Sequence, residues 1–256
     1  MPVAKPVIAG NWKMFNGPGA TRDFFQAFLA TYPPHPDRTI VFFPPAISLT
    51  TAMEAVRGRA DIGLGVQNVY WEPKGAFTGE TSAPMARDAG AQYVLVGHSE
   101  RRHVFGESDQ DVARKTKAVF DAGLTPVVCV GELLEERRAG RVDEVNLRQI
   151  NAVLDQITPE QAAELLVAYE PVWAIGTGVV ATPEDAAAAH GTLRRRLTEH
   201  LGAQHAPAVP ILYGGSVKPD NAAALLAAQD VDGLLVGGAS LDPAGFARIA
   251  AAPARA

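Results

Sequence analysis

Eight short apolar runs recur along the chain and are separated by longer segments with helix signals. The runs cover residues 6–9, 40–43, 62–65, 93–96, 126–130, 165–169, 209–213 and 233–236. They are mostly continuous and rich in β-branched residues, with no regular alternation of apolar and polar positions. That pattern is typical of strands buried on both faces of a parallel sheet.

Helix signals lie between these runs. Thr182 is a good N-cap, Pro183 suits the first helical position, and acidic residues follow in the first turn. We expect this helix to run to about Leu201, where Gly202 can end it. Similar starts stand at Ser108, Lys218 and Asp242.

Strands that alternate with helices indicate an α/β protein, and eight of them indicate a (β/α)8 barrel. The alternative is an open, doubly wound sheet. The fairly even spacing of the runs through to the last one favours closure. Because the chain has no linker, charge block or composition shift, we expect one domain over residues 1–256.

Composition narrows the class of protein further. Hydrophobic residues make up 47% of the chain and charged residues 20%, which is ordinary for a globular protein. A net charge of -5 gives no general affinity for nucleic acid or an anionic membrane, so local features must hold any anionic substrate. The single cysteine, Cys129, excludes an intramolecular disulfide. With no apolar signal segment at the start and no spanning stretch, it favours a cytoplasmic location.

Polar residues follow several of the predicted strands. Asn11 and Lys13 follow the first, His98 the fourth and Glu170 the sixth. In a (β/α)8 barrel these positions meet at one rim, where the chemistry of the fold takes place. Glu170 is interpreted as a base rather than a structural ion-pair partner, and His98 as a proton donor rather than a core histidine. Lys13 lies between Trp12 and Met14 at a strand end, which argues against a plain surface charge.

Glycine-rich turns follow the last two strands. They are Gly214-Gly215-Ser216 and Gly237-Gly238, and in this fold the corresponding loops commonly bind phosphate through bare backbone N–H groups. A pair of tight turns is the alternative, but two adjacent pairs with a serine favour phosphate. No complete dinucleotide fingerprint or P-loop is present.

Five longer motifs carry a specific resemblance. AGNWKM at 9–14, GHSERR at 97–102, AYEPVWAIGTG at 168–178, YGGSV at 213–217 and GGASL at 237–241 closely resemble triosephosphate isomerases. The resemblance extends from about Val7 to Phe246. It implies a single-domain TIM barrel that interconverts dihydroxyacetone phosphate and D-glyceraldehyde 3-phosphate through an enediolate, in glycolysis and gluconeogenesis. It implies no cofactor and no metal.

The resemblance also implies a role for each matching residue. Glu170 matches the base, His98 a neutral electrophile, Lys13 a cation that offsets the substrate's charge, and Asn11 a further oxygen contact. The phosphate grip corresponds to Gly176, Ser216, Gly237 and Gly238. Gly176 would act once a lid over residues 171–181 closes. Family members often carry a basic residue after the lid tip, whereas this chain has valine at 179 and 180.

The segment from Val69 to Glu80 is long for a loop between a strand and a helix. An ordered surface loop is one interpretation. The family pattern implies a homodimer in which this loop docks at the neighbour's active-site rim, with Thr78 nearest the neighbour's Asn11, and we adopt it. Two alternative functions call for other residues. A non-catalytic sugar-phosphate-binding barrel would lack Glu170 or His98, and a Schiff-base aldolase would need a lysine inside a later strand.

Overall fold

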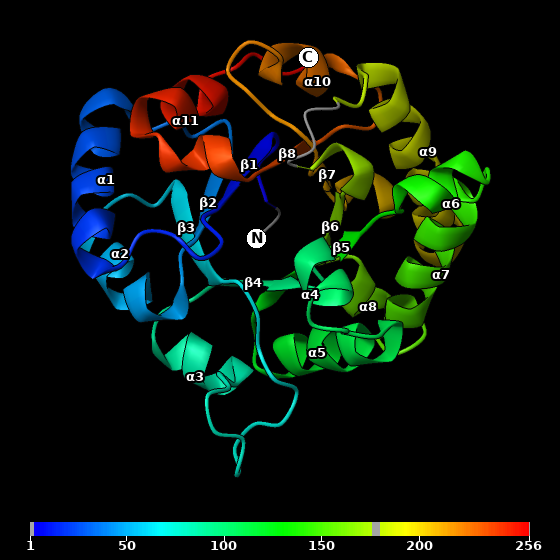
Figure 1. The fold of residues 1–256 in the computed structure, drawn as a ribbon, viewed down its shortest axis with the longest axis horizontal. Coiled ribbons are helices and arrows are strands. Elements are labelled where there is room, and N and C mark those ends of the chain that lie inside the picture. The colour runs from blue at the N-terminus through cyan, green and yellow to red at the C-terminus, as the bar shows by residue number, and fades with distance from the viewer. Residues whose placement is uncertain (1–2, 176–179, 256) are drawn as a thin grey trace.

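A computed structural model of the chain describes residues 3–175 and 180–255. Within these residues, eight parallel strands pair in sequence order, and β8 pairs back with β1, so the sheet closes into a barrel. Figure 1 shows the strands around the centre and the helices outside them. The strands are β1 (Val7–Asn11), β2 (Thr39–Phe43), β3 (Ile62–Val66), β4 (Tyr93–Val96), β5 (Thr125–Val130), β6 (Leu166–Tyr169), β7 (Ile211–Tyr213) and β8 (Gly233–Val236). The predicted barrel is confirmed, and the open sheet is excluded.

The helices begin largely where their capping residues predict. At α9, the Thr182 hydroxyl accepts the Asp185 N–H (3.1 Å) and the Asp185 carboxylate accepts the Thr182 N–H (3.0 Å). The start expected at Lys218 lies one turn too early, because residues 219–221 form a turn and the helix begins at Ala222, with Asn221 as its N-cap residue. The helices are α1 (Pro18–Thr31), α2 (Leu49–Ala55), α3 (Ala83–Asp88), α4 (Ser99–His103), α5 (Asp109–Asp121), α6 (Leu134–Arg138), α7 (Val142–Leu154), α8 (Pro159–Ala162), α9 (Pro183–Leu201), α10 (Ala222–Ala227) and α11 (Pro243–Ala250).

The core has two layers, which explains why the strand sequences do not alternate in polarity. Side chains that point outward from the strands pack under the helices, as Ile8 and Phe42 do. The inward side chains fill the barrel, so it is a packed core rather than a pore. Gly65 of β3 makes room for them, since a Cβ there would lie 2.4 Å from the Phe43 ring. The inner layer consists of Val7, Ala9, Val41, Phe43, Leu95, Val127, Cys129, Leu166, Ala168, Leu212 and Leu235.

The segment between β3 and α3 projects beyond the ring of helices, as the cyan loop in Figure 1 shows. Its own aromatic side chains order it: the ring centroid of Tyr70 lies 4.2 Å from that of Trp71 and 4.5 Å from that of Phe77. The loop closes through the Tyr70 N–H, which donates to the Thr81 carbonyl (2.8 Å). Across the described residues, no helix combines the length and apolarity needed to span a membrane.

Candidate active site

The turn after β1 holds Asn11 and Lys13 in fixed positions. Asn11 ends the strand and is buried, and its Oδ1 accepts the Lys13 N–H (2.9 Å). Lys13 has a positive φ of 49°, a conformation that is uncommon outside glycine. Gln67 stabilises it from β3's end, since its side-chain amide donates to the carbonyls of Lys13 (2.7 Å) and Phe43 (2.9 Å). The Lys13 ammonium lies 2.7 Å from Glu100 Oε1.

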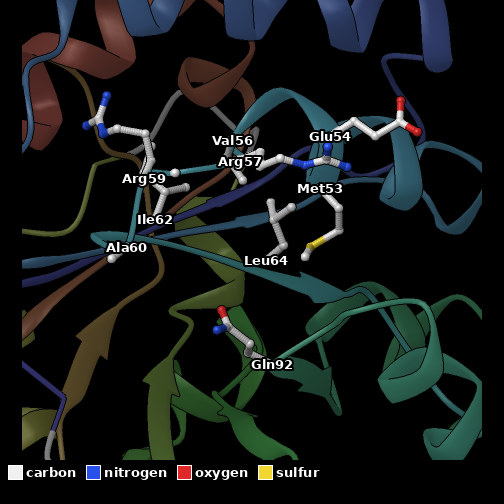
Figure 2. A pocket seen from close by; sticks show the side chains of 10 residues that line it. Met53, Glu54, Val56, Arg57, Arg59, Ala60, Ile62, Leu64 and Gln92 are labelled. Carbon is white, nitrogen blue, oxygen red and sulfur yellow. The ribbon is translucent and has the colours of Figure 1, made fainter.

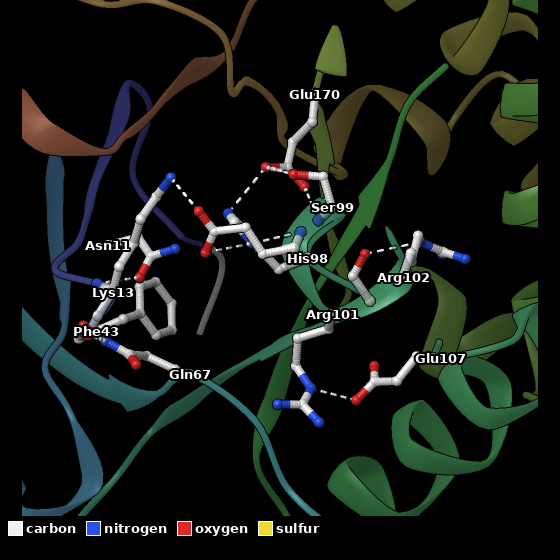
Figure 3. Close-up of polar contacts among 12 residues, drawn as sticks. Asn11, Lys13, Phe43, Gln67, His98, Ser99, Arg101, Arg102, Glu107 and Glu170 are labelled. Atoms are coloured by element: carbon white, nitrogen blue, oxygen red, sulfur yellow. Dashed lines mark hydrogen bonds and ion pairs between the residues drawn. The ribbon is translucent and has the colours of Figure 1, made fainter. Parts of the chain in front are cut away.

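His98 and Glu170 meet across the barrel rim. They follow β4 and β6, and Nε2 of His98 lies 3.0 Å from Oε1 of Glu170. Both side chains are buried, with exposed fractions of 6% and 2%. Glu170 also accepts the Ser99 N–H (2.8 Å) and the Ser99 hydroxyl (3.1 Å). Figure 3 shows the side chains of His98 and Ser99 directed at the carboxylate, with Lys13 on the facing side.

The hydrogen bonds also assign the proton on the histidine ring. The Glu100 N–H donates to Nδ1 of His98 (3.3 Å), so this nitrogen is an acceptor. A neutral imidazole then carries its proton on Nε2. His98 therefore points an N–H donor at the Glu170 carboxylate.

Burial and mutual attraction compete in this pair. Burial alone lowers the pKa of His98, but the adjacent Glu170 carboxylate outweighs it and raises the pKa above its usual value. Burial alone raises the pKa of Glu170, but His98 and the Ser99 hydrogen bonds outweigh it and lower the pKa. Each group thus stabilises charge on the other, and a ligand that separated them would return His98 towards its neutral form.

The turns after β7 and β8 form the other side of the site from β4 and β6. Their glycines leave the backbone uncovered by side chains. Gly214 allows the acid to lie where it does, because a Cβ there would be 2.9 Å from Cγ of Glu170. A Cβ on Gly238 would meet no atom within 4 Å, so this turn faces open space. The two sides enclose a cavity of about 290 Å³, lined by Asn11, Lys13, His98, Glu170, Ile175, Gly214, Gly215, Ser216, Val217, Lys218, Leu235, Gly237, Gly238 and Ala239.

A larger cavity of about 460 Å³ lies elsewhere, between α2, β3 and the residue that precedes β4. Figure 2 shows its lining, with Met53, Ile62 and Leu64 beside Arg57 and Gln92. It has no histidine or other acid–base pair of the kind that His98 and Glu170 form. The described residues contain no cluster of three or more His, Cys, Asp or Glu side chains suited to a metal ion. We place the chemistry in the smaller cavity, because it contains the buried pair of His98 and Glu170.

Comparison with known proteins agrees with this geometry. The family model described as triosephosphate isomerase matches residues 6–253. Among similar proteins, the triosephosphate isomerase of Solibacter usitatus is 50% identical over 245 residues, which is 96% of this chain and 98% of that one. That of Symbiobacterium thermophilum is 49% identical over 251 residues, 98% of each chain. That of a Roseiflexus species is 49% identical over 244 residues, 95% of this chain and 96% of that one.

The chain belongs to the triosephosphate isomerase family. The resemblance predicted from the five motifs is confirmed, and so is the barrel that it implies. The cavity collects most of the residues that family motifs single out, and Gly176 lies outside the described residues. Those it brings together are Asn11, Lys13, His98, Glu170, Ser216, Gly237 and Gly238.

Sequence reasoning missed one buried acid beside this family site. Glu132 follows β5, has no exposed area, and accepts hydrogen bonds from the Tyr169 hydroxyl (3.0 Å) and the Trp173 indole (2.7 Å). Burial raises its pKa, although these hydrogen bonds oppose the shift. The signal was available, because a carboxylate directly after a buried strand is what singled out Glu170. Glu132 ties β6 to the start of the segment that follows it.

Proposed function

We propose that Glu170 and His98 carry out the isomerisation that membership of the triosephosphate isomerase family assigns to this chain. The reaction interconverts dihydroxyacetone phosphate and D-glyceraldehyde 3-phosphate. The supporting observation is the 3.0 Å contact between Nε2 of His98 and Oε1 of Glu170, in a cavity that also contains Lys13. Proton abstraction next to a carbonyl builds negative charge on its oxygen, so one group must take the proton and another must stabilise that oxygen.

Glu170 is the base in this proposal: it takes a proton from one carbon of the substrate and returns it to the adjacent carbon. Binding of substrate must first free the carboxylate from its present contacts. In the structure its carboxylate accepts two hydrogen bonds from Ser99 and contacts His98, which lowers its pKa and makes it a weak base. A substrate that draws the carboxylate away from Ser99 removes those hydrogen bonds while the site stays buried. Burial then raises the basicity of the carboxylate at the moment when it faces the C–H bond.

His98 is the neutral electrophile. The Glu100 N–H fixes the ring so that Nε2–H is the donor, and the substrate's oxygens would replace Glu170 Oε1 in front of it. Departure of Glu170 also removes the charge that raises the pKa of His98, and burial favours the neutral ring. A neutral donor suits an enediolate, because its acidity is closer to that of the intermediate.

The remaining cavity residues bind the substrate. Lys13 supplies a cation that would interact with both Glu100 and the negative charge of the substrate. Asn11 supplies a further contact to a substrate oxygen. Backbone N–H groups of the bare turns suit a phosphate, since no side chain blocks their approach. The proposed phosphate ligands are Ser216, Gly237 and Gly238, together with Gly176.

A coupled assay with glyceraldehyde 3-phosphate tests the proposal. We expect turnover by the purified chain, and Glu170→Gln should lower kcat on the order of a thousandfold, the usual scale for a lost general base. Glu164→Gln is the matched control, because Glu164 is an exposed acid that lies before β6. A Glu170→Gln variant with normal kcat would contradict the base assignment. Substrate binding without turnover by the unmodified chain would instead indicate the non-catalytic binding barrel.

We also propose a homodimer through the loop from Val69 to Glu80. A second cavity of about 300 Å³ adjoins the first, shares Asn11, Lys13 and His98 with it, and is also lined by Phe105. Exposed apolar side chains on this part of the surface are costly in water and favour burial against another surface. They are Met14, Phe15, Ile47, Phe77, Met85, Val104 and Phe105. The loop of a second copy would fill the second cavity, with Thr78 nearest the partner's Asn11.

Sedimentation velocity at assay concentration tests the dimer. The unmodified chain should sediment as a dimer. A chain in which residues 72–77 are replaced by two glycines should sediment as a monomer with impaired turnover, because Asn11 and His98 lose the neighbouring loop. A fully active monomer of the unmodified chain would overturn this proposal and leave the catalytic assignments intact.

A further inference from the structure

Lys218 lines the active-site cavity, and no described residue neutralises its charge. It shares the cavity wall with Ser216, Gly237 and Gly238. Lys218 is exposed, and across residues 3–175 and 180–255 its ammonium group has no ion-pair or hydrogen-bond partner. Lys13, the other lysine of this cavity, differs because Glu100 lies 2.7 Å from its ammonium group.

The backbone at Lys218 is tied to the proposed phosphate ligand Ser216. Asn221 makes the connection: its Oδ1 accepts the Lys218 N–H (2.7 Å), and its Nδ2 donates to the Ser216 carbonyl (3.0 Å). Val217, between them, is buried. The main chain of Lys218 is therefore held beside Ser216, and the flexible part is the side chain alone. Because both residues line the same cavity, the Lys218 side chain stays within reach of a ligand bound at Ser216.

The charges around the cavity indicate what Lys218 contributes to it. The charged residues of the lining are Lys13, Glu170 and Lys218, and Glu100 pairs with the first of them. Lys13 and Glu100 offset each other. When His98 is neutral, as the proposed reaction requires, Lys218 is the lining residue left to offset Glu170. Without Lys218 the cavity would be net negative, in a chain of net charge -5, and would repel an anionic substrate.

We propose that Lys218 attracts and holds the phosphate group of the substrate at the β7 side of the cavity. This inference rests on the proposed function, which places a sugar phosphate there. A unit charge about 6 Å from a dianion in water changes its affinity about sevenfold at 0.01 M ionic strength and about threefold at 0.15 M. The contribution of Lys218 should accordingly appear in KM, fade as salt is added, and leave kcat unchanged.

The test compares Lys218→Gln with Lys218→Arg, which keeps the charge, and with Lys117→Gln as a matched control. Lys117 is an exposed lysine of α5 whose pair with Asp121 lies on the helix surface, so its loss makes the same change in net charge away from the cavity. The measurements are KM, kcat and the inhibition constant of inorganic phosphate at 0.01 M and 0.15 M ionic strength, conditions chosen from the screening argument.

We expect Lys218→Gln to raise KM and the phosphate inhibition constant about sevenfold at low salt and about threefold at the higher salt. Lys218→Arg and Lys117→Gln should behave as the unmodified chain does. The proposal is overturned if Lys218→Gln changes these constants no more than Lys117→Gln does, or if it lowers kcat with an unchanged salt dependence. Failure of the proposed function would look different, because the unmodified chain would itself not turn over.

Discussion

The two sides of the active-site cavity are built in different ways. On the side of β4 and β6, buried side chains hold one another: Glu170 accepts two hydrogen bonds from Ser99 and lies 3.0 Å from His98. On the side of β7 and β8, glycine turns present bare backbone, and a Cβ on Gly238 would touch nothing within 4 Å. The side chains on the side of β4 and β6 already bond to one another, whereas the side of β7 and β8 is open.

This difference assigns different tasks to the two sides. A reacting group must be placed within fractions of an ångström, which a network of buried side chains achieves before substrate arrives. A phosphate that does not react needs only donors and space, and its binding free energy can favour later steps. Changes on the first side should therefore alter kcat, whereas changes on the second should alter KM.

Among the variants that compare the two sides of the cavity, Glu170→Asp should have the largest effect. Removing one methylene retracts the carboxylate by about 1 Å, and misplacement on that scale costs on the order of a hundredfold in rate. We expect kcat to fall by about that factor while KM stays within a factor of about two, as steady-state kinetics would show. Near-normal kcat in the folded variant would remove Glu170 from the role of base.

Gly214→Ala should have the second largest effect, because Gly214 belongs to the β7 turn but lies against Glu170 of the other side. Its new methyl group would lie 2.9 Å from Cγ of Glu170 and displace the carboxylate. We expect kcat to fall about tenfold, because the carboxylate is displaced less than it is in Glu170→Asp. If KM rose instead and kcat held, the division between the two sides would be wrong at this residue.

Gly238→Ala should have the complementary effect. The added methyl group meets no protein atom, so the fold should tolerate it, but it occupies space proposed for phosphate. Weakening one charge-assisted hydrogen bond by about 1 kcal/mol would raise KM about fivefold. Kinetics should show kcat unchanged, and the melting temperature should match that of the unmodified chain.

Ser99→Ala should shift the pH profile. The Ser99 hydroxyl helps to hold the pKa of Glu170 below its usual value, so its removal should raise that pKa. A base works in its deprotonated form, so the acid limb of kcat/KM should move to higher pH. A pH profile identical to that of the unmodified chain would show that this hydrogen bond does not set the acidity of the free enzyme.

Val179→Lys should have the smallest effect. It introduces the basic residue that the family often carries after the lid tip. Residue 179 lies outside the described residues. Charges in water are screened within about 8 Å at physiological salt, so we expect KM to change by less than about threefold there. A fall in KM of about tenfold that persists at high salt, equivalent to about 1.4 kcal/mol, would reveal a direct contact to phosphate.

Much of the fold was predictable because its signals are local. Continuous apolar runs identify strands buried on both faces, and capping residues such as Thr182 and Ser108 mark helix starts within the adjacent turn. Closure followed from the even spacing of the runs. The helix after β7 starts one turn later than expected, because residues 219–221 form a turn that the signals at Lys218 do not distinguish from a helix start.

The site was predictable only to the level of which strand ends meet. That Ser99 would bond Glu170, 71 positions away, depends on side-chain conformations across the barrel. The same holds for Glu132, whose partners Tyr169 and Trp173 lie 37 and 41 positions on. The charge balance that singles out Lys218 needs the pairing of Lys13 with Glu100, which no spacing in the sequence specifies.

The most direct test of the division between the two sides is the deuterium isotope effect on kcat with dihydroxyacetone phosphate deuterated at C1. Retracting the base should make proton transfer limit turnover, so Glu170→Asp should show a primary isotope effect well above that of the unmodified chain. Gly238→Ala, which changes only phosphate binding, should show the same effect as the unmodified chain. An equal isotope effect in both variants, or none in Glu170→Asp, would contradict the separation of chemistry from phosphate binding.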